Sequence, residues 1–369
     1  MPRPRVLQVV LSLNPGGTER LVVELARRLQ ARIPAMVCCL DEAGAWAREL
    51  DAAGVQVIAL ERSGGFRPSL GRAVAEIARR HEATVIHAHH YSPFVYSCLA
   101  HFWRPGTPVV FTEHGRLSDT PPSAKRRLAN RVLARIPRRV FAVSEDLRQH
   151  LVGEGFAPDS LEVIYNGIEV GPVPDARTRA DVRERLGASD QTFVVGTIAR
   201  LDPVKDLGTL IAAASSLRAE LPILIGIVGD GPERGALEDL TRRLGIDSQV
   251  RFLGHREDAR RWLAGCDAYV NCSISEGVSL TILEAMAAAL PIVATRVGGT
   301  PEVVDPDSGR LVPPRDPSAL AAALRDLARD PDARARLGQS ARRRLEARFT
   351  LDRMVREYGD VYASVTGDR

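Results

Sequence analysis

Two glutamates in the second half of the chain combine a residue type and a spacing that suit ligand binding. Glu276 follows a short apolar run at 268–271, and Gly277 lets backbone N–H groups approach a ligand at the start of the next helix. Glu284 lies two helical turns further on among apolar residues, where a carboxylate needs a partner. The segment therefore predicts an anion pocket. A capping role for Glu276 and an arginine partner for Glu284 would explain the same spacing, and this alternative stays open.

Two basic residues, Arg200 and Lys205, flank the turn that follows another predicted strand at 193–199. A pair of cations on a loop at the end of a strand suits a phosphate group. Because the chain contains 50 Lys and Arg residues, a solvated surface pair is the alternative. We expect the two cations to matter if they face the same site as Glu276.

Glycines follow two further predicted strands. Gly16 and Gly17 open the first helix, a geometry in which N–H groups can cradle an anion. Gly229 belongs to a Gly-x-Gly turn, but Arg234 occupies the position where a dinucleotide-binding fingerprint needs its third glycine. The sequence therefore does not predict NAD binding, and it contains no GxxxxGK[ST] loop for a nucleoside triphosphate.

Histidines gather behind two strands of the first half, where His87, His89 and His90 precede His114. A zinc site that includes Glu113, buried structural histidines, and polar groups that face a ligand are the three interpretations. Side chains alternate along a strand, so His87 and His89 share a face and His90 points elsewhere, which argues against zinc. The Asp-Pro-Asp segments at 305–307 and 330–332 have the spacing of a divalent-ion site, but they lie in proline-broken turns. We expect no metal.

Apolar β-branched runs alternate with helical patterns along most of the chain, which predicts an α/β fold of two doubly wound, Rossmann-like domains facing a cleft. We expect an N-terminal domain at 1–170, a linker at 171–190, a second domain at 191–347 and a final segment at 348–369 whose helix begins at Leu351. The expected strands are 6–11, 35–40, 55–60, 84–87, 108–112, 140–143, 161–164, 193–199, 222–228, 250–253, 268–271, 292–294 and 310–312. Ligands of such sheets bind beyond the carboxyl ends of the strands.

Composition excludes several protein classes. The 369 residues are 45% hydrophobic, which suits two full-sized domains, and no apolar run approaches the length of a membrane span. A net charge of +4 does not indicate nucleic-acid binding. Five cysteines without a CxxC pair are expected to be buried core residues. No signal peptide is recognisable, so a cytoplasmic protein is expected.

One segment is strongly basic. Residues 125–139 contain no acidic residue, and Leu128, Val132 and Ile136 recur at helical spacing. The pattern predicts a basic amphipathic helix that contacts an anionic membrane surface, which would place the protein at the inner face of a membrane. The alternative is a solvated helix whose apolar stripe packs on its own sheet. A nucleic-acid contact is not expected, because aromatic residues are not interleaved.

Taken in order, these motifs resemble retaining glycosyltransferase family 4, the group 1 enzymes with GT-B architecture, over essentially the whole chain. The Glu276-x7-Glu284 element with its Glu-Ala-Met continuation is the specific signal. Further matches are the segments at 15–19, 164–168, 200–205, 228–232 and 294–302. Ala289 departs from the family pattern, which has glycine there. Because alanine disfavours positive φ, we expect a slightly different turn.

The resemblance implies a role for each matched residue. Glu284 would bind the ribose of a nucleotide sugar, Glu276 the donor sugar, and Arg200 and Lys205 the leaving diphosphate in place of a metal. The implied donor-binding residues are Gly16, Gly17, Arg200, Lys205, Gly229, Glu276, Gly277, Val278, Ser279, Leu280 and Glu284. His89 and His114 would face the acceptor, with His114 close to the anomeric centre.

The implied reaction is a metal-independent, retaining transfer from a nucleoside-diphosphate sugar to a saccharide or a lipid-linked saccharide. No cofactor is implied beyond the donor substrate. A nucleotide-sugar epimerase of the same architecture and a non-catalytic sugar-nucleotide binder stay open as alternatives.

Overall fold

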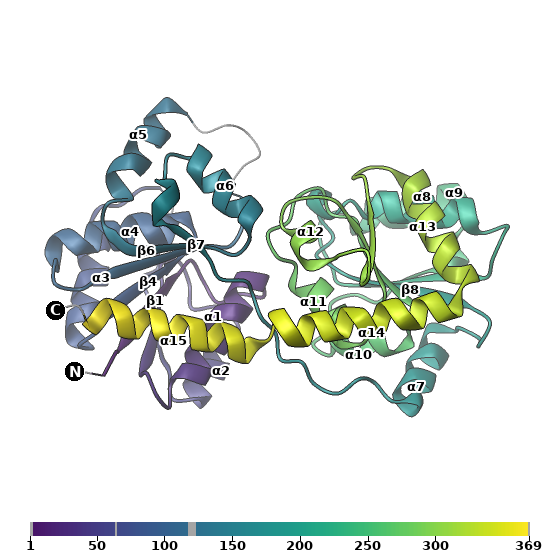
Figure 1. Ribbon diagram of the computed structural model, residues 1–369, viewed down its shortest axis with the longest axis horizontal. Helices are drawn as coiled ribbons and strands as arrows, with labels where there is room; N and C mark the ends of the chain where they lie inside the picture. The colour runs from purple at the N-terminus through teal and green to yellow at the C-terminus, as the bar shows by residue number, and fades with distance from the viewer. Residues whose placement is uncertain (1–2, 63–64, 117–122, 368–369) are drawn as a thin grey trace. The chain divides into compact units, whose positions relative to one another are not determined.

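The computed structural model describes residues 3–62, 65–116 and 123–367, and the chain divides into two compact units (Figure 1). Unit 1 comprises Met1–Gly167 and Leu351–Arg369, and unit 2 is Ile168–Thr350. Both are parallel α/β sheets covered by helices, so the predicted fold class is confirmed.

The described residues of unit 1 form a seven-stranded sheet in the order β3-β2-β1-β4-β5-β6-β7. Its strands are β1 (Val6–Val10), β2 (Ala35–Cys39), β3 (Gln56–Ala59), β4 (Val85–His89), β5 (Val109–Glu113), β6 (Pro137–Ala142) and β7 (Leu161–Val163). Its helices are α1 (Gly17–Leu29), α2 (Ala47–Ala52), α3 (Ser69–Arg80), α4 (Tyr91–Trp103), α5 (Ala124–Leu133), α6 (Glu145–Gly153), the 3₁₀ turn η1 (Pro158–Ser160) and α15 (Leu351–Gly367). The strand order reverses between β1 and β4.

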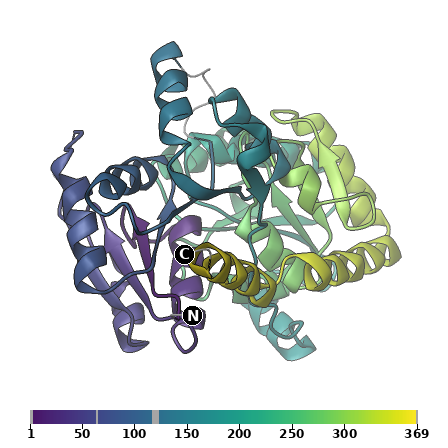
Figure 2. The same ribbon diagram turned by 60° about the vertical axis from the view of Figure 1, so that its left-hand side comes forward.

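The central strands of unit 1 are buried on both faces, as expected for a parallel sheet. They nevertheless carry the polar residues Gln8, His87, His89 and Thr112, which all lie buried. Helix α15 packs along α1 and over β4, so the last helix of the chain covers these polar side chains (Figures 1 and 2). Each buried polar group must find a hydrogen-bond partner there.

The described residues of unit 2 form a six-stranded sheet in the order β10-β9-β8-β11-β12-β13. Its strands are β8 (Phe193–Ile198), β9 (Ile223–Val228), β10 (Val250–Phe252), β11 (Ala268–Asn271), β12 (Ile292–Thr295) and β13 (Gly309–Val312). Its helices are α7 (Ala176–Leu186), η2 (Pro203–Lys205), α8 (Leu207–Leu217), α9 (Arg234–Leu244), η3 (Asp247–Gln249), α10 (Ala259–Trp262), η4 (Leu263–Gly265), α11 (Leu280–Ala287), α12 (Thr300–Val303), α13 (Pro317–Arg329) and α14 (Pro331–Arg348). The order reverses between β8 and β11.

Every expected strand is present, with bounds that differ by a few residues at most. All five cysteines are buried, as predicted. The single helix expected over 125–139 is wrong. Helix α5 ends at Leu133 and strand β6 begins at Pro137, because proline suits the start of a strand and not the interior of a helix. No helix in the described part of the chain is long and apolar enough to cross a bilayer.

The turn after α11 corrects a second expectation. Ala289 adopts φ +56°, the left-handed conformation that alanine was expected to avoid. Its carbonyl oxygen packs closely on Gly338 of α14, where a Cβ atom would overlap it. The contact between α11 and α14 therefore holds the turn in place despite the local strain.

We predict that Ala289→Gly raises the thermal stability of the protein. Glycine relieves a left-handed penalty of about 1–2 kcal/mol but adds unfolded-state entropy, so the net gain is about 0.5–1 kcal/mol, or roughly 1–3 °C in Tm. Ala288→Gly is the matched control, because Ala288 has an ordinary φ of −80° and should lose stability on substitution. Equal Tm losses in both variants, measured by calorimetry, would contradict the strain.

Candidate functional site

The centre of the candidate site in unit 2 is an ion pair between Lys205 and Glu276. Lys205 Nζ donates to Glu276 Oε1 at 2.6 Å, and the side chains are only 24% and 11% exposed. Ser273 Oγ donates to the same oxygen at 2.7 Å, and Asn271 Nδ2 lies 3.3 Å from it. A half-buried carboxylate with three donors is held in one orientation. Spacing alone gave Lys205 and Glu276 as separate features, and the family resemblance implied that both bind the donor. The structure brings the two side chains together.

The strand order explains why these residues meet. Lys205 follows β8 and Glu276 follows β11, the neighbouring strands at which the order of the sheet reverses. Loops that leave such strands diverge to opposite faces and open a crevice at the carboxyl edge. The two loops are tied by a hydrogen bond from Ile274 N–H to the Val204 carbonyl, at 2.8 Å.

A glycine holds the Glu276 loop from behind. Gly298 has φ +50°, and a Cβ atom there would overlap the Glu276 carbonyl oxygen. The neighbouring Gly299 N–H donates to that oxygen at 3.3 Å. The loop after β12 thus fixes the backbone of Glu276, and any side chain at Gly298 would push it away.

Helix α11 carries the remaining predicted residues of this segment. Its N-cap is Ser279, whose Oγ contacts Asn271 Nδ2 and Thr281 Oγ1, so the turn from Gly277 through Val278 to Leu280 is tied to strand β11. Glu284 lies further along the same helix and is half-buried. Burial raises the pKa of the Tyr269 phenol, and the negative charges of Glu284 and Glu276 raise it further, so both carboxylates act on one buried group.

Tyr269 is a site residue that the sequence reasoning missed. Its hydroxyl donates to Thr281 Oγ1 at 2.7 Å and thereby anchors the first turn of α11 to strand β11. A buried tyrosine needs such a partner for its hydroxyl. The polar Tyr269 and Asn271 in a short buried strand directly before the Glu276 loop were the available signal.

Arg200 does not join the ion pair. Its side chain is 73% exposed, and its nearest described acid is Asp202, at 3.6 Å from Nε. Gly229 packs closely against the same turn. A Cβ atom at Gly229 would overlap the Ala199 carbonyl oxygen, and the Gly229 N–H donates to the Gly254 carbonyl. Gly229 therefore allows two loops to pack closely together, and Arg200 lies on the turn that they form.

Unit 1 has an equivalent cluster at its own reversal of strand order. Thr18 follows β1, His90 follows β4, and Glu113 ends β5. His90 Nε2 lies 2.8 Å from Thr18 Oγ1, and His90 Nδ1 lies 2.7 Å from Glu113 Oε1. The backbone of His90 has φ +72°, a strained conformation for a residue with a side chain. Burial lowers the pKa of His90, but the hydrogen bond and charge of Glu113, with Glu19, outweigh it and raise the pKa overall.

The other histidines of the predicted cluster, His87, His89 and His114, each contact protein atoms. Both ring nitrogens of His87 and of His89 are within hydrogen-bond distance of protein atoms, and His114 Nε2 contacts His89. This arrangement favours polar side chains held in a network over zinc ligands. In the described residues, no group of three or more His, Cys, Asp and Glu side chains has the geometry of a metal site. Of the two aspartate pairs, Asp305 pairs with Arg344 and Asp330 caps α14.

Gly16 and Gly17 lie at the N-terminus of α1, where Gly16 is the N-cap without a side-chain cap. A Cβ atom at Gly16 would overlap the Glu19 carboxylate. The pair therefore brings the Glu19 side chain back over the loop, close to Thr18.

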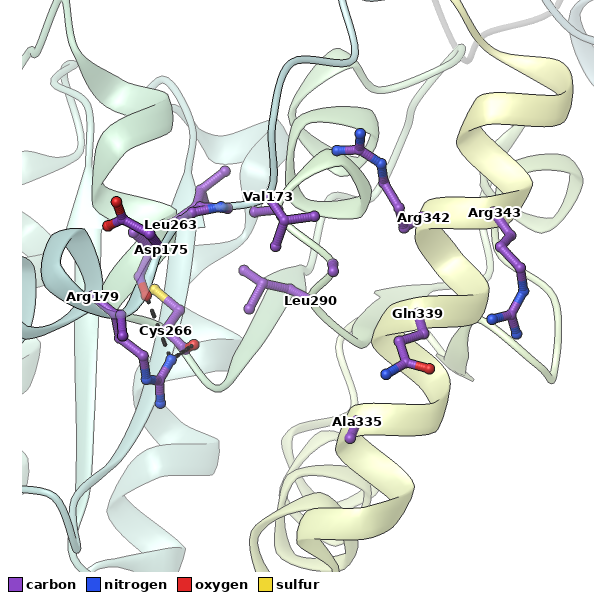
Figure 3. Close-up of a pocket in the computed structure, with 15 residues that line it drawn as sticks. Val173, Asp175, Arg179, Leu263, Cys266, Leu290, Ala335, Gln339, Arg342 and Arg343 are labelled. Carbon is purple, nitrogen blue, oxygen red and sulfur yellow. Dashed lines mark hydrogen bonds between the residues drawn. The ribbon is translucent and has the colours of Figure 1, made fainter.

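A cavity in the described part of unit 2 lies elsewhere. It has a volume of about 650 Å³ and is lined by segments that precede β11 and β12, together with α7 and α14. Figure 3 shows Arg179 and Arg342 on opposite sides of it, with Gln339 pointing inward. Arg179 donates to the Ala264 and Cys266 carbonyls, and Arg342 to that of Ala287. None of the predicted site residues lines this cavity, which is at the amino ends of the strands.

Comparisons with known proteins bear on both units. Residues 15–171 match the family described as Glycosyltransferase Family 4, and residues 192–330 match the family described as Glycosyl transferases group 1. The chain is 31% identical to a D-inositol 3-phosphate glycosyltransferase of Salinispora tropica, over 82% of this chain and 68% of the relative. It is 28% identical to an N-acetyl-alpha-D-glucosaminyl L-malate synthase of Bacillus anthracis, over 81% of this chain and 80% of the relative.

A solved structure adds a ligand to the comparison. The crystal structure of Anabaena Alr3699/HepE in complex with UDP has a TM-score of 0.88 and 26% identity, and the match covers 98% of this chain and 100% of that chain. The two parallel α/β sheets agree with these matches. The chain belongs to the glycosyltransferase group 1 family and is a glycosyltransferase with the GT-B fold.

Proposed function

We propose that this glycosyltransferase transfers a sugar, with retention of configuration and without a metal ion, from a nucleoside-diphosphate sugar to a saccharide or a lipid-linked saccharide. Unit 2 would bind the donor and unit 1 the acceptor. The observation that carries the proposal is the Lys205–Glu276 ion pair at the carboxyl edge of unit 2. The UDP complex of the Anabaena relative supports a nucleotide donor.

The donor pocket follows from the fixed carboxylates. The Glu276 carboxylate would accept hydrogen bonds from hydroxyl groups of the donor sugar, because its orientation is set before the ligand binds. Glu284 would accept the ribose hydroxyls two helical turns away. The turn from Gly277 to Leu280 precedes α11, so its N–H groups suit the diphosphate.

Lys205 would take the place of a metal ion. Negative charge grows on the leaving diphosphate oxygen as the glycosidic bond breaks, and a nearby ammonium group stabilises it. Lys205 can turn from Glu276 toward that oxygen while Glu276 keeps its contacts to Ser273 and Asn271. The exposed guanidinium of Arg200 supplies the second cation from the turn after β8.

The acceptor site would involve His89 and His114 in unit 1, and the resemblance adds Gly16 and Gly17 to the donor-binding residues. The names of the relatives also indicate a second acceptor class, because D-inositol 3-phosphate and L-malate are small hydroxylated anions. The raised pKa of His90 favours such an anion near Thr18. Testing both classes of acceptor with each purified donor decides between them.

A lipid-linked acceptor is supported by the surface of α5. Its inner face carries polar contacts beside Leu133, which packs on the core: Tyr91 O–H donates to Asn130 Oδ1 at 2.6 Å, and Arg126 pairs with Glu154 at 2.8 Å. Its outer face presents Leu128 and Val132, which are 64% and 56% exposed. Leu128 and Val132 therefore do not pack on the core, whereas Ile136, the third residue of the predicted stripe, does. Basic residues flank the two exposed side chains. An apolar stripe with basic flanks suits an anionic lipid surface.

We predict that Lys205→Met lowers kcat by about 10²-fold, the usual loss when one stabilising donor is removed from the transition state. Lys205→Arg should lose less, since it keeps the charge. EDTA should leave wild-type turnover unchanged, and Mg²⁺ should not rescue Lys205→Met. Complete loss of wild-type turnover in EDTA, restored by a divalent cation, would contradict the cation role.

The anomeric configuration of the product, read by NMR, tests retention.

We predict that Gly298→Ala abolishes the thermal stabilisation of the protein by UDP, because the new methyl group displaces the Glu276 backbone. Gly235→Ala is the matched control, since nothing lies near its added Cβ atom in helix α9. A UDP-induced Tm shift of equal size in both variants would argue against the Glu276 loop as the donor pocket.

We predict that the protein co-sediments with anionic phosphatidylglycerol vesicles at low salt and not with phosphatidylcholine vesicles. Replacing Leu128 and Val132 by serine should weaken this binding at least about tenfold, since two apolar side chains no longer leave water. Val173→Ser, another exposed apolar position, should bind like the wild type. Vesicle binding that the double variant retains in full would overturn the role of α5.

A further inference from the structure

A continuous chain of hydrogen bonds crosses unit 1 from His114 to helix α15. It links three strands to the last helix of the chain, and all its members are buried or half-buried. Its steps are His114 Nε2 to His89 Nδ1 (2.9 Å), His89 Nε2 to Gln8 Oε1 (2.7 Å), Gln8 Nε2 to Tyr362 OH (3.2 Å), Tyr362 OH to His87 Nδ1 (2.6 Å), His87 Nε2 to Thr112 Oγ1 (2.8 Å) and Thr112 Oγ1 to Tyr358 OH (3.1 Å).

The three histidines in this series of hydrogen bonds are neutral at pH 7. Burial lowers the pKa of His87, of His89 and of His114 well below the usual value, and the neighbouring imidazoles lower it further. A neutral imidazole has one N–H donor and one lone-pair acceptor. The position of each proton is therefore decided by the hydrogen-bond partners of the ring.

Gln8 sets the direction of the chain toward His114. The Gln8 Oε1 atom can only accept, so His89 Nε2 carries the proton and His89 Nδ1 is a lone pair. That lone pair can only accept, so His114 Nε2 must carry the proton that lies between the two rings. The second nitrogen of His114, Nδ1, is then left without a proton.

The amide nitrogen of Gln8 faces Tyr362 in this orientation. The amide nitrogen of Gln8 donates to the Tyr362 oxygen, and the Tyr362 O–H in turn donates to His87 Nδ1. His87 Nε2 then donates to Thr112. If the amide were reversed, each of these donors would become an acceptor, and His114 Nδ1 would carry a proton.

The series of hydrogen bonds ends at an atom without a partner. His114 Nδ1 is buried and has no hydrogen-bond partner among the residues that the structure describes. It follows strand β5, beside the Thr18, His90 and Glu113 cluster, and the His90 and His114 rings are in edge contact. A buried acceptor without a partner is a place for a donor from a ligand.

We propose that Gln8, His89 and Tyr362 are positioning residues that hold His114 in the Nε2–H tautomer, so that Nδ1 accepts a hydrogen bond from a substrate hydroxyl. The proposal rests on the proposed function only in the identity of that ligand. The lone pair of Nδ1 repels an anionic oxygen and attracts an O–H group. The group that meets His114 is therefore an uncharged hydroxyl of the substrate, and not a phosphate or carboxylate oxygen.

The test compares two tyrosines of the same helix. Tyr362→Phe and Tyr358→Phe each remove one buried hydroxyl from α15, but only Tyr362 contacts Gln8. Nitrogen-15 NMR of the full-length protein with labelled histidine reads the tautomer of each ring directly. We expect the wild type and Tyr358→Phe to show His114 with a protonated Nε2, and Tyr362→Phe to show a mixture of tautomers. A protonated Nδ1 in the wild type, or identical His114 signals in all three proteins, would overturn the proposal.

Kinetics separate this proposal from the proposed function. With an active donor and acceptor pair, Tyr362→Phe should lower kcat about tenfold with little change in KM, the effect of one lost neutral hydrogen bond, while Tyr358→Phe stays close to the wild type. Gln8→Glu, which keeps an acceptor toward His89, should retain the His114 tautomer, and Gln8→Leu should not. Equal kcat losses in both tyrosine variants would mean that α15 acts through stability alone. Correct NMR tautomers in a protein without transferase activity would refute the proposed function and leave the positioning chain standing.

Discussion

The reversal of strand order in each parallel sheet is the constraint on which the chemistry of this protein depends. In unit 2 the neighbours at the reversal are β8 and β11, and the loops that follow them carry Lys205 and Glu276. Because neighbouring parallel strands end at the same edge of the sheet, an ammonium group and a carboxylate on the loops that follow them meet there. The ion pair is a consequence of topology, and the close contact of Gly298 holds the Glu276 backbone in place.

Unit 1 uses the same device with different side chains. Its reversal lies between β1 and β4, and there Thr18, His90 and Glu113 form a short polar series. The burial of Gln8, His87 and His89 in the central strands would be costly without partners, and helix α15 supplies them. Helix α15 thus forms part of the interior of unit 1. This is why the segment from Leu351 onward belongs to the same unit as residues that are far from it in sequence.

Much of the fold follows from the sequence, because β-branched apolar runs separated by helical periodicity leave few alternatives to two parallel sheets. Strand positions were predicted within a few residues, and Glu276 and Lys205 were found from their place after strands. The pairing of Lys205 with Glu276 was not predictable, since strand order is a long-range property. The left-handed Ala289 was missed because its stabilising contact, Gly338, is distant in sequence. Tyr269 and Gln8 were missed because a polar residue in an apolar strand shows its partner only after folding.

The most direct test of the account is a crystal structure of the protein with UDP bound. We expect the diphosphate at the carboxyl edge of β8 and β11, with Lys205 Nζ moved from Glu276 to a phosphate oxygen and the ribose hydroxyls on Glu284. A diphosphate bound instead in the cavity between α7 and α14, at the amino ends of β11 and β12, would contradict the account.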